Sequence, residues 1–161
     1  MKIRTLRGQI TASGGKADKQ LILNDQLINS GFKITGFFVW PVESTGSLNY
    51  SFSAILSYAQ LGSATVEMNA ADNTQIGWCY GTVRAQTSAG PPVIDTPAAG
   101  FGPAPHGFID PDHIINRDLF VSIREADADR TFNYMVVGHH IDLSDNEAII
   151  TIIKENSQSI E

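Results

Sequence analysis

The sequence predicts an all-β, jelly-roll-like antiparallel β-sandwich that ends in a short α-helix. Short segments in which apolar and polar residues alternate recur along the chain, and each is bounded by Gly, Asn, Asp or Pro. Helical periodicity is almost absent before the C-terminal segment. The chain of 161 residues has the size of one ordinary domain, so we expect a single sandwich over residues 1–161.

The expected strands cover residues 2–11, 19–24, 33–40, 48–59, 75–84, 117–125 and 131–137. The clearest period of two lies in 48–59, where Tyr50, Phe52 and Ala54 alternate with serines, which is typical of a half-buried strand. Pro41 has no N–H to donate, so the strand over 33–40 should end there.

The last two expected strands are joined by an Asp-rich segment, 126–130, that contains no large apolar residue. This pattern is typical of an exposed hairpin loop. We therefore expect 117–125 and 131–137 to pair with each other as antiparallel neighbours.

A segment rich in Pro and Gly, residues 86–107, shows no periodicity. So long an irregular segment inside a compact domain is typical of an arm that lies across a neighbouring subunit, and the alternative is a solvated surface loop. Apolar residues in and beside the segment could anchor such an arm, and a purely solvated linker would not need them. They are Val93, Ile94, Phe101 and Phe108.

The C-terminal segment predicts a helix over about 144–158. Ser144 and Glu147 have the spacing of a capping box, and Ile149 and Ile153 then fall on one face. We expect this isoleucine face to dock on the sheet or on a partner chain. The same β-branched residues could also form a strand, and the cap favours the helix.

Charge and cysteine content narrow the function classes. Seventeen acidic and eleven basic residues give a net charge of −6, and we expect no binding to nucleic acid because no basic cluster is visible. No apolar run has the length of a membrane span or of a signal-peptide core, so we expect neither membrane insertion nor secretion. Cys79, the sole cysteine, lies between two aromatic residues and is expected to be a buried thiol.

Two clusters contain residues that could ligate a metal. Asp110, Asp112 and His113 lie within four residues, but Asp-Pro is a common turn opening, and we favour a turn over a metal site. His139 and His140 are adjacent, so in a strand they would point to opposite faces and could not easily bind one ion. We therefore expect no cofactor.

Motifs for catalysis are also missing. The sequence has no G-x-S-x-G elbow, no phosphate-binding glycine loop and no dinucleotide fingerprint, and we expect a protein that is not an enzyme. The polar residues that follow the DPDH turn are better candidates for contacts across strands or with a neighbouring chain. These are Arg117 and Asp118.

Three stretches together resemble a family of small β-rich proteins encoded by tailed bacteriophages, particularly marine ones. They are EMNAADNTQIGWCYGTV, FIDPDHIINRDLFVSI and FNYMVVGHHIDLSDNEAIITIIKENSQ. The resemblance implies a virion structural protein that is assembled in the host cytoplasm, with the major capsid protein or other virion subunits as partners. Charged residues make up only 17% of the chain, so the polar surface should be mostly uncharged. With this surface and the arm, the resemblance favours a capsid decoration or cement protein over another head–tail component. We expect a homo-oligomer, with a trimer preferred.

The competing function class is a carbohydrate-binding β-sandwich, a receptor or host-surface module. Its candidate stacking residues are Trp40, Tyr50, Tyr58 and Trp78. All four lie within apolar alternation, so packing in the core or on the sheet is the favoured interpretation.

Overall fold

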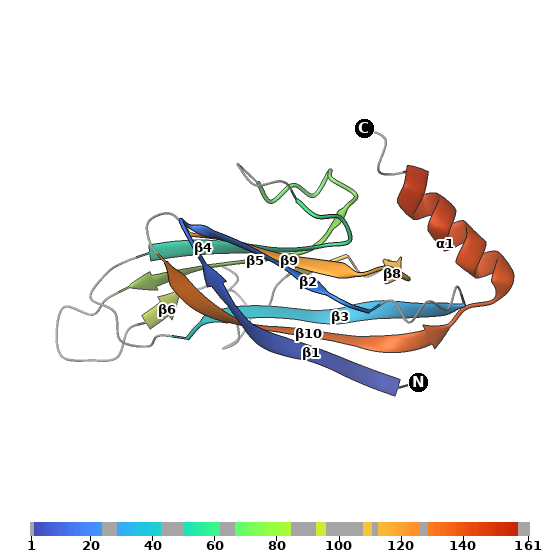
Figure 1. Ribbon diagram of the computed structural model, residues 1–161, viewed down its shortest axis with the longest axis horizontal. Coiled ribbons are helices and arrows are strands. Elements are labelled where there is room, and N and C mark those ends of the chain that lie inside the picture. Colours follow the sequence, from blue (N-terminus) through green and yellow to red (C-terminus); the bar gives the residue numbers. More distant parts are fainter. Residues whose placement is uncertain are drawn as a thin grey trace.

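The computed structural model describes residues 2–23, 29–42, 50–61, 67–84, 93–95, 108–110, 113–125 and 129–157. Two antiparallel sheets face each other, and a helix lies at one end of the molecule (Figure 1). The predicted all-β sandwich with a C-terminal helix is confirmed. Asp112 and Phe101, two of the residues named in the predictions above, fall outside the described residues.

The four-stranded sheet has the order β1-β10-β3-β8. Its strands are β1 (Lys2–Ala12), β10 (Arg130–Asp142), β3 (Ser30–Pro41) and β8 (Ile114–Ile115). The six-stranded sheet has the order β2-β9-β4-β5-β6, and β7 also pairs with β5. Its strands are β2 (Lys16–Leu21), β9 (Leu119–Glu125), β4 (Tyr50–Ser57), β5 (Gln75–Arg84), β6 (Val93–Asp95) and β7 (Phe108–Ile109).

The strand order is that of a jelly roll. The short β6 and β7 only extend β5, and without them β8, β9 and β10 become the sixth, seventh and eighth strands of the described chain. The two sheets then have the orders 1-8-3-6 and 2-7-4-5, in which successive strands alternate between the sheets except at β4 and β5. This interleaving is the pattern of two Greek keys that wrap around one core.

Alternation along the strands builds the core between the sheets. Phe37 from β3 and Phe132 from β10 are fully buried, and the Phe132 ring lies 5.1 Å from the Phe52 ring of β4 in the opposite sheet. Tyr50, Phe52 and Ala54 are buried as the period of two predicts. The outward side of β4 is less exposed than predicted, because Ile55 is paired with Trp78 and is only 1% exposed.

The expected hairpin between the last two strands is wrong. β9 lies between β2 and β4 in one sheet, while β10 lies between β1 and β3 in the other, so the two strands do not pair. A short polar connection allows either a hairpin or a crossing from one sheet to the other. The choice depends on which strands already flank each partner, and local sequence does not contain that information.

The predicted C-terminal helix is confirmed, as α1 (Asp145–Ser157). The capping box forms: the Ser144 amide and hydroxyl donate to Glu147 Oε2 over 2.9 and 2.7 Å. Leu143 and Ala148 are both buried on either side of the cap, at the positions of a hydrophobic staple. The competing strand interpretation of this segment is therefore wrong.

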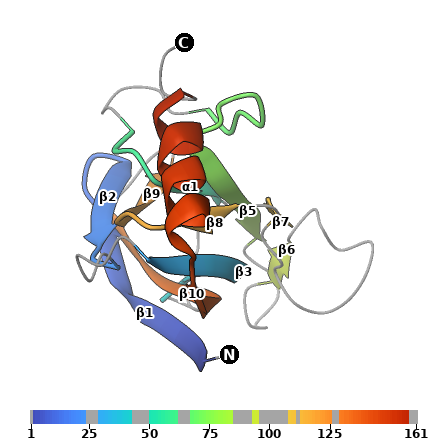
Figure 2. The ribbon, with the colours of Figure 1, turned by 90° about the vertical axis from the view of Figure 1, so that its right-hand side faces the viewer.

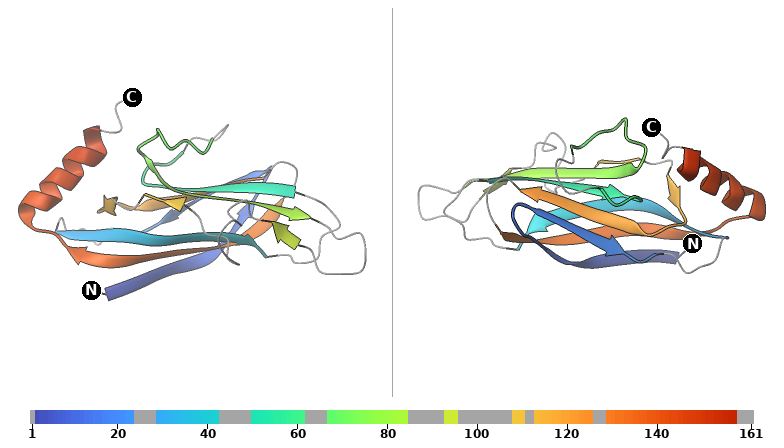
Figure 3. Two further views of the ribbon diagram at one scale, coloured as in Figure 1. Left: turned by 180° about the vertical axis from the view of Figure 1, so that it is seen from behind. Right: turned by 45° about the horizontal axis from the view of Figure 1, so that its top comes forward.

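The helix extends beyond the end of the sandwich instead of lying across a sheet. Figures 2 and 3 show it at the same end as the N-terminus, where it starts from the end of β10 and rises past the level of the other sheet. No helix in the described part of the chain has the length and apolar character needed to cross a bilayer.

Most of the predicted arm, residues 86–107, falls outside the described residues. The part that is described, β6, is paired with the end of β5 through Thr82, Val83 and Arg84. Val93 and Ile94 therefore belong to a strand at the edge of the six-stranded sheet.

Candidate functional site

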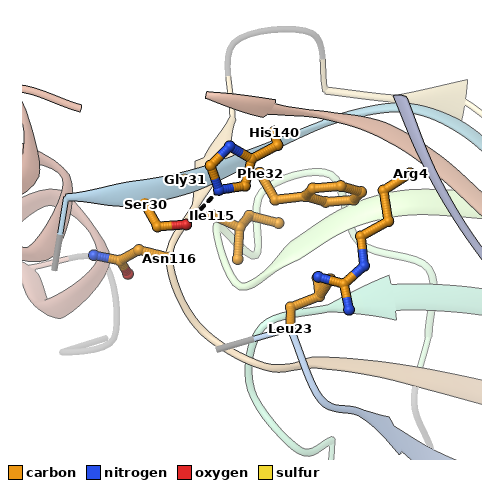
Figure 4. A pocket seen from close by; sticks show the side chains of 8 residues that line it. All are labelled: Arg4, Leu23, Ser30, Gly31, Phe32, Ile115, Asn116 and His140. Carbon is orange, nitrogen blue, oxygen red and sulfur yellow. Dashed lines mark hydrogen bonds between the residues drawn. The ribbon is translucent and has the colours of Figure 1, made fainter. Parts of the chain in front are cut away.

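A cleft opens at the end of the sandwich that carries the N-terminus and α1. Its cavity volume is about 20 Å³, and the open space around its mouth brings this to about 300 Å³. Side chains from both sheets and their connections line it (Figure 4), namely Arg4, Leu23, Ser30, Phe32, Ile115, Asn116 and His140, together with Gly31.

Strand register brings the polar residues of this cleft together. On β1, the even-numbered residues face the core, as Ile10 and Ala12 show by their burial, so Arg4 faces the same side near the open end. Arg4 pairs with Gly138 on β10, and His140 follows two residues later on the same face. His140 in turn pairs with Phe32 on β3.

Gly138 shapes the floor of the cleft. A Cβ atom at this position would lie 2.6 Å from the Lys33 carbonyl oxygen and 2.6 Å from Cε1 of Phe32. The absence of a side chain therefore lets the Phe32 ring rest against the β10 backbone. Phe32 and Ile115 are 4% and 1% exposed and form an apolar floor between polar walls.

The other rim of the cleft is held by Asp118. Its carboxylate accepts the Leu23 amide over 3.0 Å and the Gln20 side-chain amide over 2.8 Å. Asp118 thereby fixes the chain just after β2 at the point where Leu23 lines the cleft. Asp118 thus contacts Gln20 of β2 within this chain. A contact of Asp118 with a neighbouring chain stays a prediction.

Ser30, His140 and Asp142 stand in the order hydroxyl, imidazole, carboxylate. Ser30 Oγ lies 2.8 Å from His140 Nε2, and His140 Nδ1 lies 3.7 Å from Asp142 Oδ1. Acyl transfer by such a triad needs a buried carboxylate that holds the imidazole through a short hydrogen bond. Here the carboxylate side chain is 97% exposed and its distance exceeds hydrogen-bond length, so water competes for it.

The electrostatics of the cleft differ from those of the whole protein. Although the chain carries a net charge of −6, the described lining residues include one arginine and one histidine and no acidic side chain. Within the described part of the chain, the side chains of Arg4 and Asn116 have no hydrogen-bond or ion-pair partner. No described residue therefore occupies their N–H groups.

Asp110 and His113, the described residues of the DPDH segment, do not line the cleft. His113 Nδ1 lies 3.3 Å from Asp110 Oδ2, and the His113 ring stacks on Tyr58 with centroids 5.5 Å apart. The Asp110 amide donates to the Ile76 carbonyl over 2.9 Å, which ties the segment to β5. Pro111 and Asp112 lie outside the described residues, so the predicted turn itself stays a prediction.

The adjacent histidines are separated as their positions in a strand predict. His140 lines the cleft, whereas His139 pairs with Ile3 and Lys33 on the neighbouring strands and belongs to the opposite face. Among the described residues, no three His, Cys, Asp or Glu side chains are placed to share a metal ion. The histidines are thus not brought together with each other or with His113.

The candidate contact residues fall on several parts of the surface. Phe108 is 59% exposed on β7, and Arg117 is half-buried in the connection before β9. Ile149 and Ile153 are 53% and 59% exposed on α1.

The candidate sugar-stacking aromatics do not form a shared platform. Tyr50 and Tyr58 are 7% and 5% exposed and pack in the core, and Arg130 covers the Tyr50 ring at 3.9 Å. The half-buried Trp40 and Trp78 belong to β3 and β5, in different sheets. Trp78 also donates its indole N–H to Gln75 Oε1 over 2.8 Å.

Three residues of the cleft were missed by sequence reasoning: Arg4, Ser30 and Asn116. They are more than 20 positions apart, and none belongs to a recognisable motif. The one signal in the sequence was the Gly-His-His-x-Asp run at 138–142, which marks a polar interruption in an apolar strand. Arg4 and Ser30 can be placed near this run only when β1 and β3 are known to flank β10.

Comparison with known proteins adds no family to these observations. No protein-family model matches the chain, and no curated protein matches it with significant similarity.

Proposed function

We propose that the protein is a non-enzymatic structural protein of a bacteriophage virion, a capsid decoration or cement protein that stabilises the shell through contacts between subunits. The major capsid protein or other virion subunits would be its partners, and it would act as a homo-oligomer, preferably a trimer. Another head–tail component is the nearest alternative within the same class. The resemblance of three long stretches to phage proteins is the starting point of this proposal.

The observation that carries the proposal is the exposed isoleucine face of α1. Ile149, Ile150 and Ile153 are 53%, 53% and 59% exposed. Among the helix residues whose side chains are described, Ala148 alone is buried. A helix of 13 residues gains most of its stability from packing, so one that leaves three isoleucines exposed and a fourth, Ile152, only half-buried favours contact with a second protein surface.

The fold is compatible with this role. A jelly roll closes its core with two sheets and leaves the connections and termini free for neighbours, and viral shells and lectins both use it. In this protein α1 and the N-terminus share one end of the sandwich (Figure 1). A subunit that joined neighbours through that end would leave the opposite end open to solvent or to the shell.

The first test is the oligomeric state and particle binding of two variants. Ile149→Ser and Ile153→Ser should weaken self-association by light scattering and reduce binding to phage particles that lack the protein. Because Ser and Ile have similar helix propensities, the melting temperature should change little. Ile22→Ser, at a residue that is 73% exposed outside the helix, is the matched control and should behave as wild type.

A monomeric wild-type chain that binds stripped particles no better than an unrelated acidic protein would overturn this proposal. Equal loss of binding in the Ile22→Ser control would show that general hydrophobicity, and not the helix face, drives association.

The second test concerns the proposed lack of enzymatic activity. Ser30 and His140 have the geometry most similar to a catalytic pair, so p-nitrophenyl acetate hydrolysis should be measured for wild type, Ser30→Ala and His140→Gln. We expect equal rates for all three, because Asp142 is too exposed and too distant to orient the imidazole. A rate that falls in both variants would contradict the proposal.

The positions of the aromatic residues favour the structural class over the carbohydrate module. A stacking platform needs exposed rings on one surface, whereas the two tyrosines are buried and the two tryptophans belong to different sheets.

A further inference from the structure

We infer that the cleft at the α1 end of the sandwich binds a carboxylate group carried on a small polyhydroxylated molecule, such as a uronic acid sugar unit. The inference rests on the cleft residues Arg4, Ser30, Phe32, Asn116 and His140. It does not depend on the proposed structural role, because these residues are separate from the isoleucine face of α1.

The cleft supplies hydrogen-bond donors to a ligand. Arg4 offers a planar guanidinium that matches a carboxylate in two parallel hydrogen bonds, and Asn116 offers a side-chain amide. Neither has a partner within the described part of the chain. Ser30 is oriented by His140 Nε2 at 2.8 Å, so its hydroxyl is held at the cleft wall.

The polar groups of the cleft lie on two opposite walls. In Figure 4, Arg4 lies on one side of the cleft, Ser30 and Asn116 lie on the other, and Phe32 and Ile115 lie between them. A ligand at the mouth that reaches both walls needs a negative group at one end and hydroxyl groups at the other. An acidic sugar ring combines these two features, whereas acetate or phosphate supplies the charge alone.

The cleft is small. Its cavity volume of about 20 Å³ takes a group the size of one water molecule and is well below the volume of about 300 Å³ at which ligand pockets commonly begin. One sugar unit would therefore lie over the mouth with a single substituent inserted, and we expect weak binding, with a dissociation constant on the order of 1 mM.

The charge of the surroundings makes the site selective for anions. The protein as a whole repels them with its net charge of −6, so binding at this cleft requires the local field of Arg4. Raised salt should weaken the binding, because Arg4 is exposed and its interaction is screened.

The experiment is an NMR titration of the full chain with D-glucuronate, with D-glucose, acetate and inorganic phosphate as separate arms. Backbone amides of Gly31 and Asn116 and the His140 ring report on the cleft. We expect saturable shifts with glucuronate, and at least about tenfold weaker effects with the other three probes.

Two arginine variants on one strand provide the control. Arg4→Gln should weaken glucuronate binding about tenfold or more, since it removes the charged donor. Arg7→Gln lies three residues away on the opposite, exposed face of β1 and should bind as wild type. Asn116→Ala is a second cleft variant that should also weaken binding. It keeps the inference testable if Arg4→Gln disturbs the fold.

Several results would overturn the inference. No saturable shift with glucuronate would remove the site, and equal responses to glucose or acetate would show that the combined recognition of sugar and carboxylate is wrong. Tighter binding of phosphate, or equal losses in Arg4→Gln and Arg7→Gln, would also contradict it. Light scattering of Arg4→Gln should equal that of wild type, because Arg4 lies outside the isoleucine face of α1. A loss of glucuronate binding is then not caused by a loss of self-association.

Discussion

Arg130 donates from Nε to Glu125 Oε1 over 3.1 Å, and the two residues belong to different sheets. Glu125 ends β9 and Arg130 begins β10, so the ion pair spans the connection that carries the chain across the sandwich. The Glu125 side chain is fully buried and that of Arg130 is 13% exposed, and the Arg130 guanidinium also covers the Tyr50 ring of β4. The pair thus joins three strands at one end of the core.

Arg130→Met should destabilise the fold by about 3–5 kcal/mol, because it removes one partner of an ion pair whose carboxylate is fully buried. Urea unfolding gives the value. The double variant Glu125→Gln with Arg130→Met should recover part of the loss. Asp18→Asn weakens the pair with Arg124, whose carboxylate side chain is 22% exposed where that of Glu125 is fully buried, and should cost less than about 1 kcal/mol. Equal costs for Arg130→Met and Asp18→Asn would contradict the importance of the buried pair.

Gly138→Ala should destabilise the protein by about 1–3 kcal/mol or more, because the added Cβ would meet both the Lys33 carbonyl and the Phe32 ring. Gly8→Ala is the matched control on β1. Its Cβ would approach the Tyr134 hydroxyl, which is the end of a side chain and can move. Thermal unfolding should therefore rank Gly138→Ala as the more damaging change, and the reverse order would contradict the packing of Phe32 against β10.

The helix cap should be visible in the titration of Glu147. Hydrogen bonds from the Ser144 hydroxyl and amide lower the pKa of Glu147 below its usual value of 4.5. A carboxylate with a depressed pKa in the folded state stabilises the helix at pH above 4.5, and this contribution is lost as the pH falls through the folded pKa. In Ser144→Ala, NMR titration should show the pKa of Glu147 moving back up. An unchanged pKa in this variant would contradict the cap.

Cys79 should react slowly in the folded protein. It is 3% exposed, and burial raises the pKa of its thiol above the usual 9.0. Labelling by a thiol reagent should be more than about 1,000-fold slower than in urea, because it needs transient opening of the core. Stability should also begin to fall as the pH rises above 9.0, since the unfolded chain then releases this proton first. Rapid labelling of the folded protein would contradict both points.

Local patterns in the sequence were sufficient to locate most elements. Alternation of apolar residues located β4, β9 and part of β10, and the spacing of Ser144 and Glu147 located the start of α1. These signals depend on neighbours a few residues away, so they survive without knowledge of the fold. β2 was placed three residues too late, because its first half, Lys16–Asp18, has little apolar character and pairs at the sheet edge.

The sequence by itself determined the all-β class, the C-terminal helix with its cap, and the separation of His139 from His140 on opposite faces of a strand. Each follows from periods of two or 3.6 residues, which are properties of the local backbone. The tertiary structure alone decided that β9 and β10 belong to different sheets, that the isoleucine face of α1 stays exposed, and that Arg4, Ser30 and His140 meet at one cleft. These features depend on which strands lie side by side, and strand order is set by the packing of residues far apart in the chain.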